Sequence, residues 1–277
     1  MKQHFPLALL ICSAACAGRD VPPADSTVAP GEPPVVTITA RDFAFTMPDT
    51  IQSGVTKIVL VNEGPQLHHA QLVRFDEGKT LADLQAALKA GGLPPTWAHD
   101  MGGPNPPAVG QSTSTTERLE PGNYAVLCFV DLPDHVPHFV KGMTKAFVVI
   151  PGTNNAVEPT PTVTMTIADY SFTTSVPLTA GKHIVQVVNN GPQTHEVAIF
   201  KLDSAKTLDD FMKFAETYQG APPATAKGGI AGIKPGSTHY FDVDLTPGEY
   251  VLLCFVPDSK DGKPHMMHGM LQKLTIQ

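Results

Sequence analysis

Short apolar runs, separated by glycine and proline, make up most of the hydrophobic pattern of the chain. Two such runs are residues 57–61 (Lys-Ile-Val-Leu-Val) and residues 146–150 (Ala-Phe-Val-Val-Ile), and both are rich in β-branched side chains. Runs of this kind, bounded by turn residues, are typical of strands. Because several short strands recur along the chain, the pattern predicts an all-β protein built as a sandwich.

Two segments depart from the strand pattern and predict one short helix in each half of the chain. Thr80 can cap a helix through its hydroxyl group, and Asp83 occupies the third helical position, as in a capping box. The residues that then repeat at helical spacing are Leu81, Leu84 and Leu88. Thr207 and Asp210 begin the second segment in the same way.

The sequence contains an internal duplication. Residues 62–68 (Asn-Glu-Gly-Pro-Gln-Leu-His) match residues 189–195 (Asn-Asn-Gly-Pro-Gln-Thr-His) at an offset of 127. Residues 121–128 (Pro-Gly-Asn-Tyr-Ala-Val-Leu-Cys) match residues 247–254 (Pro-Gly-Glu-Tyr-Val-Leu-Leu-Cys), at an offset that is one residue shorter. Solenoid units span about 20 to 50 residues, so this long offset with only two copies indicates duplicated domains.

Each copy is long enough to fold around a core of its own. A domain of roughly 115 residues buries about two-thirds of the surface of its unfolded chain. We therefore expect a first domain at residues 35–152, a linker at residues 153–161 and a second domain at residues 162–277.

The N-terminus has the pattern of an export signal. Lys2 precedes an apolar run at residues 5–11, and small residues follow at positions 13–15, before Cys16. The apolar run is far shorter than the ~20 residues that span a bilayer as a helix. We therefore interpret residues 1–16 as a signal peptide that directs the protein to the periplasm or another extracytoplasmic compartment.

The residues around the cleavage point leave two outcomes of export open. Ser-Ala-Ala-Cys resembles the bacterial lipoprotein signal, in which Cys16 becomes the lipidated first residue and anchors the protein to a membrane. Cleavage near Ala17 releases a soluble secreted protein instead. Both routes lead to an oxidising compartment. The proline-rich residues 17–34 then form an extended linker before the first domain.

Composition and charge exclude some classes of partner and fold. The 277 residues include 26 acidic and 19 basic side chains, so the net charge is −7 and nucleic acid is not an expected partner. The 23 glycines and 27 prolines argue against long helical bundles. Cys12 and Cys16 belong to the signal, which leaves only Cys128 and Cys254 in the body. These two occupy equivalent positions in two intact domains, so we do not expect a disulfide between them.

Each copy contains one early histidine, followed by a cysteine, a histidine and a methionine within one short segment. These residues are His68, Cys128, His138 and Met143 in the first copy, and His195, Cys254, His265 and Met270 in the second. Two imidazoles, a thiolate and a weak thioether are the donor set of a blue-copper site, because soft sulfur favours Cu(I) and imidazole suits both oxidation states. Buried Cys and Met are also ordinary core residues, but here all four donors recur at matched positions.

Strand periodicity separates the candidate ligand His68 from its neighbour His69. Counting by two from His68 gives Ala70 and Leu72, so this face is apolar and His69 lies on the opposite one. We therefore expect His69, which aligns with Glu196, to be a solvated or edge residue.

The motifs described above resemble those of the cupredoxin family of small blue copper proteins. The similarity is carried by the Pro-Gly-x-Tyr-x-x-x-Cys strand, by the His and Met after it, and by the upstream Gly-Pro-Gln-x-His turn. Residues 136–143 (Val-Pro-His-Phe-Val-Lys-Gly-Met) are especially similar to the type 1 copper loop of copper nitrite reductases. The resemblance implies two tandem Greek-key β-sandwiches, each holding one type 1 copper through the four donors of its copy, with Met143 and Met270 axial.

Two features depart from the family pattern. Nine residues separate Cys128 from His138, and ten separate Cys254 from His265, which is longer than in small blue copper carriers. His69, and Glu196 in the second copy, stand where the family often has an asparagine that helps to fix the ligand loops.

The sequence predicts an electron carrier rather than an enzyme. Nitrite reductases place a histidine for a second copper directly before the cysteine, where Leu127 and Leu253 stand here, and the His-x-His pairs of multicopper oxidases are absent. We expect exchange of electrons with redox proteins such as cytochromes or a membrane electron-transfer complex. One alternative is a copper-binding or delivery protein, suggested by residues 266–268 (Met-Met-His). Another is a copper-free structural subunit of a membrane complex.

Overall fold

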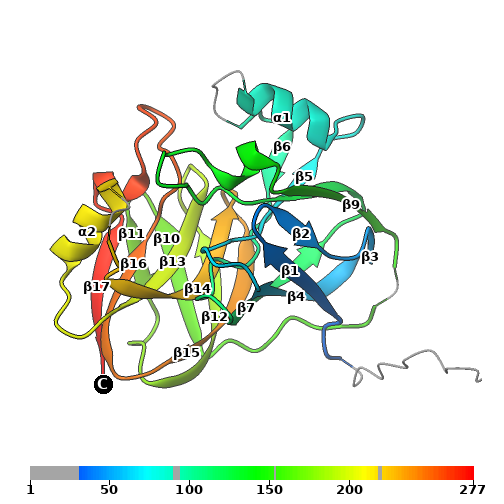
Figure 1. Cartoon of the computed structure of the whole chain (residues 1–277). Coiled ribbons are helices and arrows are strands. Elements are labelled where there is room, and N and C mark those ends of the chain that lie inside the picture. The colour runs from blue at the N-terminus through cyan, green and yellow to red at the C-terminus, as the bar shows by residue number, and fades with distance from the viewer. Residues whose placement is uncertain (1–30, 90–93, 153, 218–219) are drawn as a thin grey trace, which may run out of the picture.

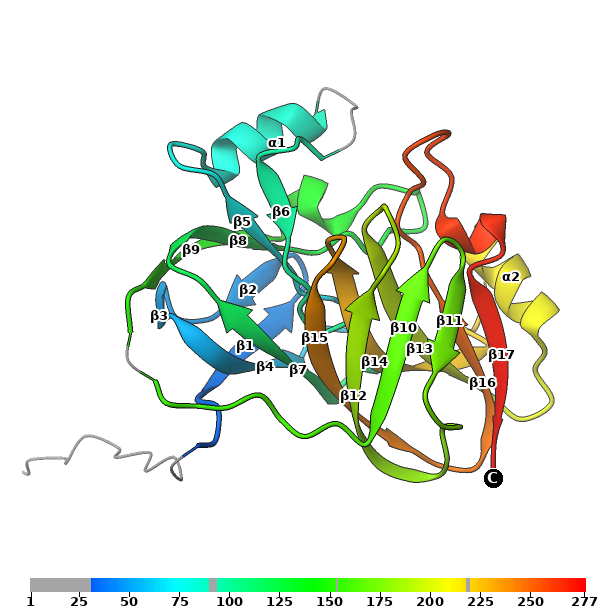
Figure 2. The ribbon, with the colours of Figure 1, turned by 180° about the vertical axis from the view of Figure 1, so that it is seen from behind.

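Two β-sandwiches lie side by side, one formed by each copy of the repeat (Figure 1 and Figure 2). The computed structural model describes residues 31–89, 94–152, 154–217 and 220–277. The predicted signal peptide, with Cys16, and most of the first linker lie outside these residues. The predicted fold class, two tandem sandwiches with one short α-helix each, is confirmed.

The first sandwich is built from two sheets, in the orders β2-β1-β4-β7 and β3-β9-β8-β5-β6. β1 pairs in parallel with β4, and β3 with β9, so neighbouring strands are not consecutive in the chain, as in a Greek key. The elements are β1 (Val35–Arg41), β2 (Ala44–Thr46), β3 (Thr50–Gln52), β4 (Gly54–Asn62), β5 (Gln71–Phe75), α1 (Leu81–Lys89), β6 (Ala98–Asp100), β7 (Ser112–Leu119), β8 (Gly122–Leu127), the 3₁₀ turn η1 (His138–Lys141) and β9 (Thr144–Ile150).

The second sandwich repeats this plan, with sheets in the orders β11-β10-β12-β15 and β14-β13-β16-β17. β10 again pairs in parallel with β12. The elements are β10 (Val163–Ala168), β11 (Ser171–Thr174), β12 (Gly181–Asn189), β13 (His195–Leu202), α2 (Leu208–Thr217), β14 (Ala224–Ile233), β15 (Thr238–Leu245), β16 (Gly248–Leu253), the 3₁₀ turn η2 (His265–His268) and β17 (Leu271–Ile276).

Alternating side chains build a core inside each sandwich. In β10, for example, Val163, Met165 and Ile167 are buried and the residues between them are partly exposed. The two helices cover the outer faces of the sheets. Leu84 of α1 packs against the outer face of β5 and β8, and Phe211 of α2 packs on Phe200 of β13. The predicted cores therefore form within each copy.

The predicted helix starts are confirmed in both copies. The carboxylate of Asp83 accepts hydrogen bonds from the backbone N–H and the hydroxyl group of Thr80, and Asp83 N–H donates to the Thr80 hydroxyl oxygen. Thr207 and Asp210 make the same reciprocal bonds. Each pair satisfies N–H groups that a helix terminus leaves without an internal partner.

The two sandwiches share one continuous sheet, which the sequence analysis did not predict. β7 pairs antiparallel with β15, with Thr115 opposite Phe241, and this joins the first sheet of each domain into eight strands. Residues 101–107 also run along β14, with bridges from Met101 to Ile233 and from Pro104 to Ile230. The edge strands β7 and β15 therefore cover each other's free backbone groups.

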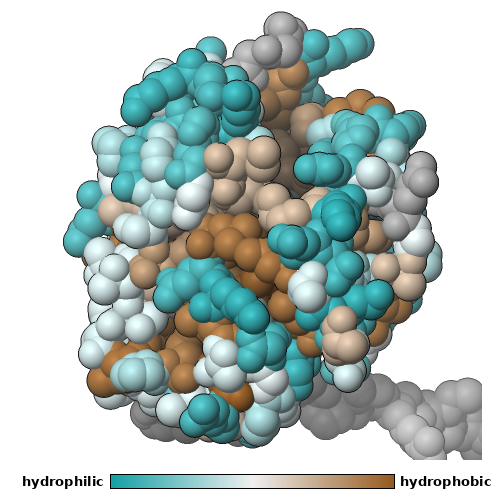
Figure 3. Space-filling view, turned by 90° about the vertical axis from the view of Figure 1, so that its left-hand side faces the viewer, coloured by the Kyte–Doolittle hydropathy of each residue, from teal (hydrophilic) through white to brown (hydrophobic). Residues whose placement is uncertain are grey.

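The outer surface is mixed in polarity. On the side that lies at the left in Figure 1, apolar residues gather in the middle of the face and hydrophilic residues surround them (Figure 3). Among the described helices, none combines the length and apolar character needed to cross a membrane.

Candidate metal centres

Two histidines and a cysteine converge in the first domain. Nδ1 of His68 lies 3.1 Å from Nδ1 of His138, and the latter atom lies 3.5 Å from Sγ of Cys128. All three side chains are fully buried, and one donor atom from each lies within 4.8 Å of the others. The structure thus brings together three of the donors that the sequence singled out for this copy.

Local backbone contacts place these donors at one end of the sandwich. Cys128 directly follows β8, and His138 begins η1. Phe139 N–H donates to the carbonyl oxygen of Cys128 at 2.8 Å, and His138 N–H donates to that of Val130 at 2.9 Å. The long loop between Cys128 and His138 therefore folds back onto its own start, so its length does not separate the two donors.

Met143 completes the segment of the first site. Gly142 ends η1 with a φ of 102°, a left-handed conformation that glycine adopts without strain. After this turn, Met143 N–H donates to the carbonyl oxygen of His138, and the carbonyl oxygen of Met143 accepts from Cys128 N–H. Met143 is fully buried in the core cluster that also contains Cys128. Its position beside both ligand segments is compatible with the predicted axial role.

The outer nitrogen of each histidine is hydrogen-bonded, which fixes its tautomer. Nε2 of His68 donates to Asp42 Oδ1 at 2.8 Å, and Nε2 of His138 donates to Gln66 Oε1 at 3.0 Å. Since both acceptors are oxygens, the two Nδ1 atoms carry lone pairs. Two lone pairs that face each other at 3.1 Å, beside a sulfur, repel each other unless a positive charge lies between them. The residues therefore fit a metal ion held by both Nδ1 atoms and the sulfur.

The second domain repeats this geometry. Nδ1 of His195 lies 2.9 Å from Nδ1 of His265, which lies 3.4 Å from Sγ of Cys254. All three residues are fully buried. Asp169 Oδ1 accepts from His195 Nε2 at 2.6 Å, as Asp42 does in the first domain. Met270 is fully buried, and its main chain bonds both His265 and Cys254.

The sequence analysis missed the residues that orient the histidines. Asp42 and Asp169, which accept from the first histidine of their sites, stand 127 residues apart. Gln66 and Gln193 have the same spacing, but Gln193 bonds Asp169 and Asp258 and leaves Nε2 of His265 without a hydrogen-bond partner. Both pairs therefore obey the same repeat that revealed the ligands. Such outer partners fix ring orientation and raise the basicity of a ligand.

Burial sets the protonation of the donors in the absence of metal. It raises the pKa of the Cys128 thiol to about 12 and also raises that of Cys254. It lowers the pKa of His138 to about 4, with the neighbouring His68 acting in the same direction. The imidazoles are therefore neutral at pH 7 and ready to bind, whereas metal binding must displace a proton from each thiol.

His69 lies outside the His68-Cys128-His138 group, as expected, but the expectation that it is solvated is wrong. His69 is half-buried, and its Nε2 accepts a hydrogen bond from Phe129 N–H at 2.8 Å. Glu196 is buried, and its Oε1 accepts from Phe255 N–H at 2.7 Å. The strand face that carries them is covered by the other domain instead of by water. Each of these side chains therefore accepts a backbone hydrogen bond from the residue that follows the cysteine of its own domain.

A third group of possible metal ligands lies on the loop of the second site. It consists of Asp258, Asp261 and His268. Asp258 already accepts hydrogen bonds from Tyr170 and Gln193, and Asp261 pairs with Lys263 and His268. These carboxylates are satisfied by protein donors, so the group does not have the character of the two buried centres.

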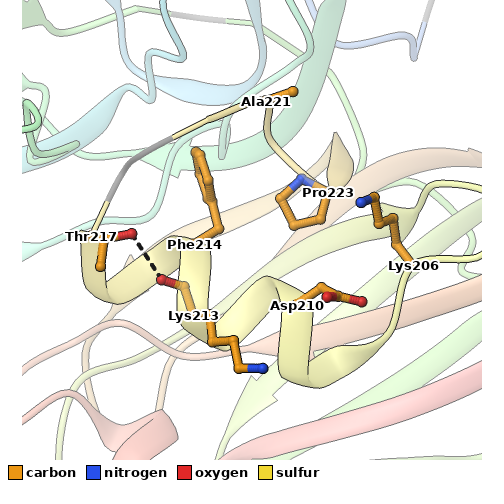
Figure 4. A pocket seen from close by; sticks show the side chains of 7 residues that line it. All are labelled: Lys206, Asp210, Lys213, Phe214, Thr217, Ala221 and Pro223. Carbon is orange, nitrogen blue, oxygen red and sulfur yellow. Dashed lines mark hydrogen bonds between the residues drawn. The ribbon is translucent and has the colours of Figure 1, made fainter.

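A surface hollow beside α2 also lacks the chemistry of a metal centre. It is lined by Lys206, Asp210, Lys213 and Phe214, among others, and contains neither histidine nor cysteine (Figure 4). The side-chain hydroxyl of Thr217 there donates to the carbonyl oxygen of Lys213 at 3.1 Å. We therefore place the candidate chemistry at the two His-Cys-His groups.

Several solved structures are similar to this chain, and two of the three described next are copper nitrite reductases. Reduced auracyanin from the photosynthetic bacterium Roseiflexus castenholzii is 19% identical, with a TM-score of 0.29, over 44% of this chain and 100% of that one. Copper nitrite reductase from Nitrosomonas europaea is 12% identical, with a TM-score of 0.26, over 88% of this chain and 93% of that one. The copper-containing nitrite reductase from Thermus scotoductus is 11% identical, with a TM-score of 0.24, over 88% of this chain and 61% of that one. No protein-family model and no curated protein matches the chain.

The class of the protein follows from its own topology and donors. Two Greek-key sandwiches, each with a cysteine at the end of one strand and two histidines from neighbouring loops, form a two-domain cupredoxin-like fold. Buried imidazole and thiol groups of this kind suit copper. The two His-Cys-His groups thus fit a type 1 copper site.

Proposed function

We propose that the protein is an exported blue copper protein that carries electrons, with one type 1 copper in each domain. The donors are His68, Cys128, His138 and Met143 in the first domain, and His195, Cys254, His265 and Met270 in the second. Bound copper supplies reversible one-electron oxidation and reduction.

One observation carries this proposal. In both domains, two Nδ1 atoms and one sulfur face a common point from which water is excluded, with the Nδ1 atoms 3.1 Å and 2.9 Å apart. The chain holds these donors through strand ends, 3₁₀ turns and the outer bonds to Asp42 and Asp169. A rigid donor set changes little when the metal changes oxidation state, which favours electron transfer.

The residues before the two cysteines favour a carrier over an enzyme. Leu127 and Leu253 are fully buried in the apolar clusters beneath α1 and α2. They offer no donor to a second metal at the position where nitrite reductases place a histidine. Reduction of a small molecule needs an open position at a metal, and the proposed four-donor sites leave none.

Copper delivery receives less support from the second loop than the sequence suggested. Met266 is buried in the cluster beneath α2, where it packs among apolar side chains. His268 is also exposed, but its ring pairs with Asp261, and Met267 is the one exposed methionine of the two, at 58%. A single exposed methionine is a poor capture site for Cu(I).

We further propose that the protein works in the periplasm or another extracytoplasmic compartment, either anchored by a lipid on Cys16 or secreted. Its proposed partners are redox proteins such as cytochromes or a membrane electron-transfer complex. The pattern of residues 1–16 and the linker after them support the location.

Copper loading of the purified protein tests the function. We expect intense visible absorption from thiolate-bound copper, which disappears on reduction by a small cytochrome or dye and returns on oxidation. A protein that binds no copper, or that binds it without this absorption, would be a structural subunit or a copper-binding protein and would overturn the carrier proposal.

A further inference from the structure

A single asparagine lies between the two domains and bonds to both sides. Asn105 is 1% exposed and belongs to the segment between β6 and β7 of the first domain. Its Nδ2 donates to Glu196 Oε2 at 3.2 Å and to the carbonyl oxygens of Val197 and Ile230 at 3.0 Å each. All three acceptors belong to the second domain.

On the side of the second domain, Glu196 connects Asn105 to the cysteine of the second site. Its other carboxylate oxygen accepts from Phe255 N–H at 2.7 Å, and Phe255 directly follows Cys254. The backbone N–H of Glu196 also donates to Sγ of Cys254 at 3.4 Å. Glu196 is therefore bonded to the cysteine segment through both its side chain and its main chain.

On the side of the first domain, His69 makes the corresponding connection. Its Nε2 accepts from Phe129 N–H, so in the neutral ring Nδ1 carries the proton. Asn105 also faces His69, where it favours the protonated form of the ring, as a hydrogen-bond acceptor does. Because Nδ2 of Asn105 is committed to the second domain, its carbonyl oxygen is the atom that faces His69. The result is a chain of polar contacts from Phe129, beside Cys128, through His69, Asn105 and Glu196 to Phe255.

Asn105 breaks the repeat at the place where the two copies meet. Gly102-Gly103 corresponds to Gly228-Gly229, with similar positive φ angles, so Asn105 corresponds to Ala231. His69 and Glu196 are equivalent residues, and the side chain of Asn105 faces both of them. The second copy has no such polar residue, because alanine stands at the equivalent position.

We propose that this bridge carries an electron between the two copper sites within one chain, an inference that rests on the proposed function. One electron leaves Cu(I) at one site and reduces Cu(II) at the other, and no proton moves and no covalent bond forms or breaks. Electronic coupling falls less steeply through covalent and hydrogen bonds than through gaps, so the bridge is the favoured route. The protein thereby accepts an electron at one domain and releases it at the other.

Two substitutions interrupt the bridge. Asn105→Ala removes the central amide. Glu196→Gln keeps the shape of the side chain but replaces one of its two acceptor oxygens with an NH₂ group. The variant therefore loses either the bond from Asn105 or the bond from Phe255. The matched control is Gln71→Ala, which removes a buried amide that donates across the same interface to the carbonyl oxygen of Gly232, at 2.9 Å, and that makes no side-chain hydrogen bond to either cysteine segment.

The experiment follows electron redistribution after a short pulse of radical reductant, at less than one electron per copper-loaded protein. All proteins carry Met270→Gln, which changes the axial donor of the second site and separates its visible band. The potential of each site is titrated separately. We expect a first-order exchange between the two bands that is independent of protein concentration, slowed about tenfold or more by Asn105→Ala and by Glu196→Gln, and unchanged by Gln71→Ala.

The outcomes separate this inference from the proposed function. If neither site shows a visible band, the proposed function fails and the inference fails with it. If both bands and both potentials persist in Asn105→Ala but exchange is as fast as before, the bridge is not the route and the inference alone is wrong. Exchange whose rate rises with protein concentration would also overturn it, because electrons would then pass between molecules.

Discussion

The carboxylate of Asp258 lies 3.6 Å from Nε2 of His265, one of the two histidines of the second site. Asp258 is 1% exposed, and hydrogen bonds from Tyr170 and Gln193 hold the pKa of its carboxyl group well below the usual range. It is therefore ionised. The corresponding position of the first domain holds Leu132. Besides the carboxylates that both centres share, Asp42 and Asp169, the second centre thus has a buried carboxylate where the first has an apolar side chain.

This difference predicts unequal reduction potentials. A nearby carboxylate stabilises Cu(II) over Cu(I), so we expect the second site to have the lower potential and Asp258→Asn to raise it. Redox titration of the single-site protein Cys128→Ala measures this potential. The control is Asp261→Asn, which removes a more exposed carboxylate from the same loop. A shift no larger than that of the control would contradict the assignment.

Each domain is expected to bind its own copper ion. Copper analysis of the wild type, Cys128→Ala and Cys254→Ala should give about two, one and one ions per chain, because each site has a single thiolate. Each variant should retain the visible band of the intact site. Equal copper content in all three proteins would contradict the thiolate assignment.

His68 and His69 are expected to behave differently although they are adjacent. His68→Ala removes a donor from the buried group, so the visible band of the first site should disappear. His69→Ala removes the acceptor for Phe129 N–H but no donor of the buried group, so copper should remain bound with a shifted band. Absorption spectra of the two variants in the Cys254→Ala background test this. Loss of the band in His69→Ala alone would reverse the assignment.

The stability of the metal-free protein should fall as the pH is lowered from about 6.5 towards 4. Burial lowers the pKa of five histidines in the native state, whereas the unfolded chain takes up protons near pH 6.5. Glu196 and Asp100 act in the opposite sense, because burial raises their pKa values to about 7 and about 6. Burial also raises the pKa of Asp131, which acts in the same sense as these two carboxyl groups. The histidines are His68, His69, His138, His195 and His265.

Urea unfolding of the metal-free protein at several pH values measures this slope. The free energy of unfolding should rise with pH between 4 and 6.5, since the five histidines outnumber the three carboxyl groups whose pKa is raised. A flat profile, or a fall in stability over this range, would show that the histidines are already protonated in the native state.

The copper-loaded protein is expected not to turn over nitrite. Leu127 and Leu253 supply no second-metal ligand, and the four-donor sites offer no open position. Nitrite loss and oxygen uptake, measured with the reduced protein after loose copper is chelated, should equal the background of free copper. Turnover that persists after chelation and disappears in His69→Ala would indicate an enzyme.

The sequence by itself determined the local structure and the candidate donors. The strands, the Thr80 and Thr207 helix caps and the duplication follow from short-range patterns, which depend on backbone geometry and nearest neighbours. The duplication also identified the donors. Because a repeat preserves spacing, Cys128 and Cys254 stand at the ends of equivalent strands. In each copy, one histidine precedes the cysteine and another follows it, at matched positions.

Only the tertiary structure decided what lies on the far face of those strands. Alternation places His69 opposite His68 but does not say whether water or protein covers that face. Pairing of β7 with β15 brings the second domain against it, which buries Glu196 and lets Asn105 contact both sides. Residues 105 and 196 are separated by most of a domain, and only long-range packing brings them together.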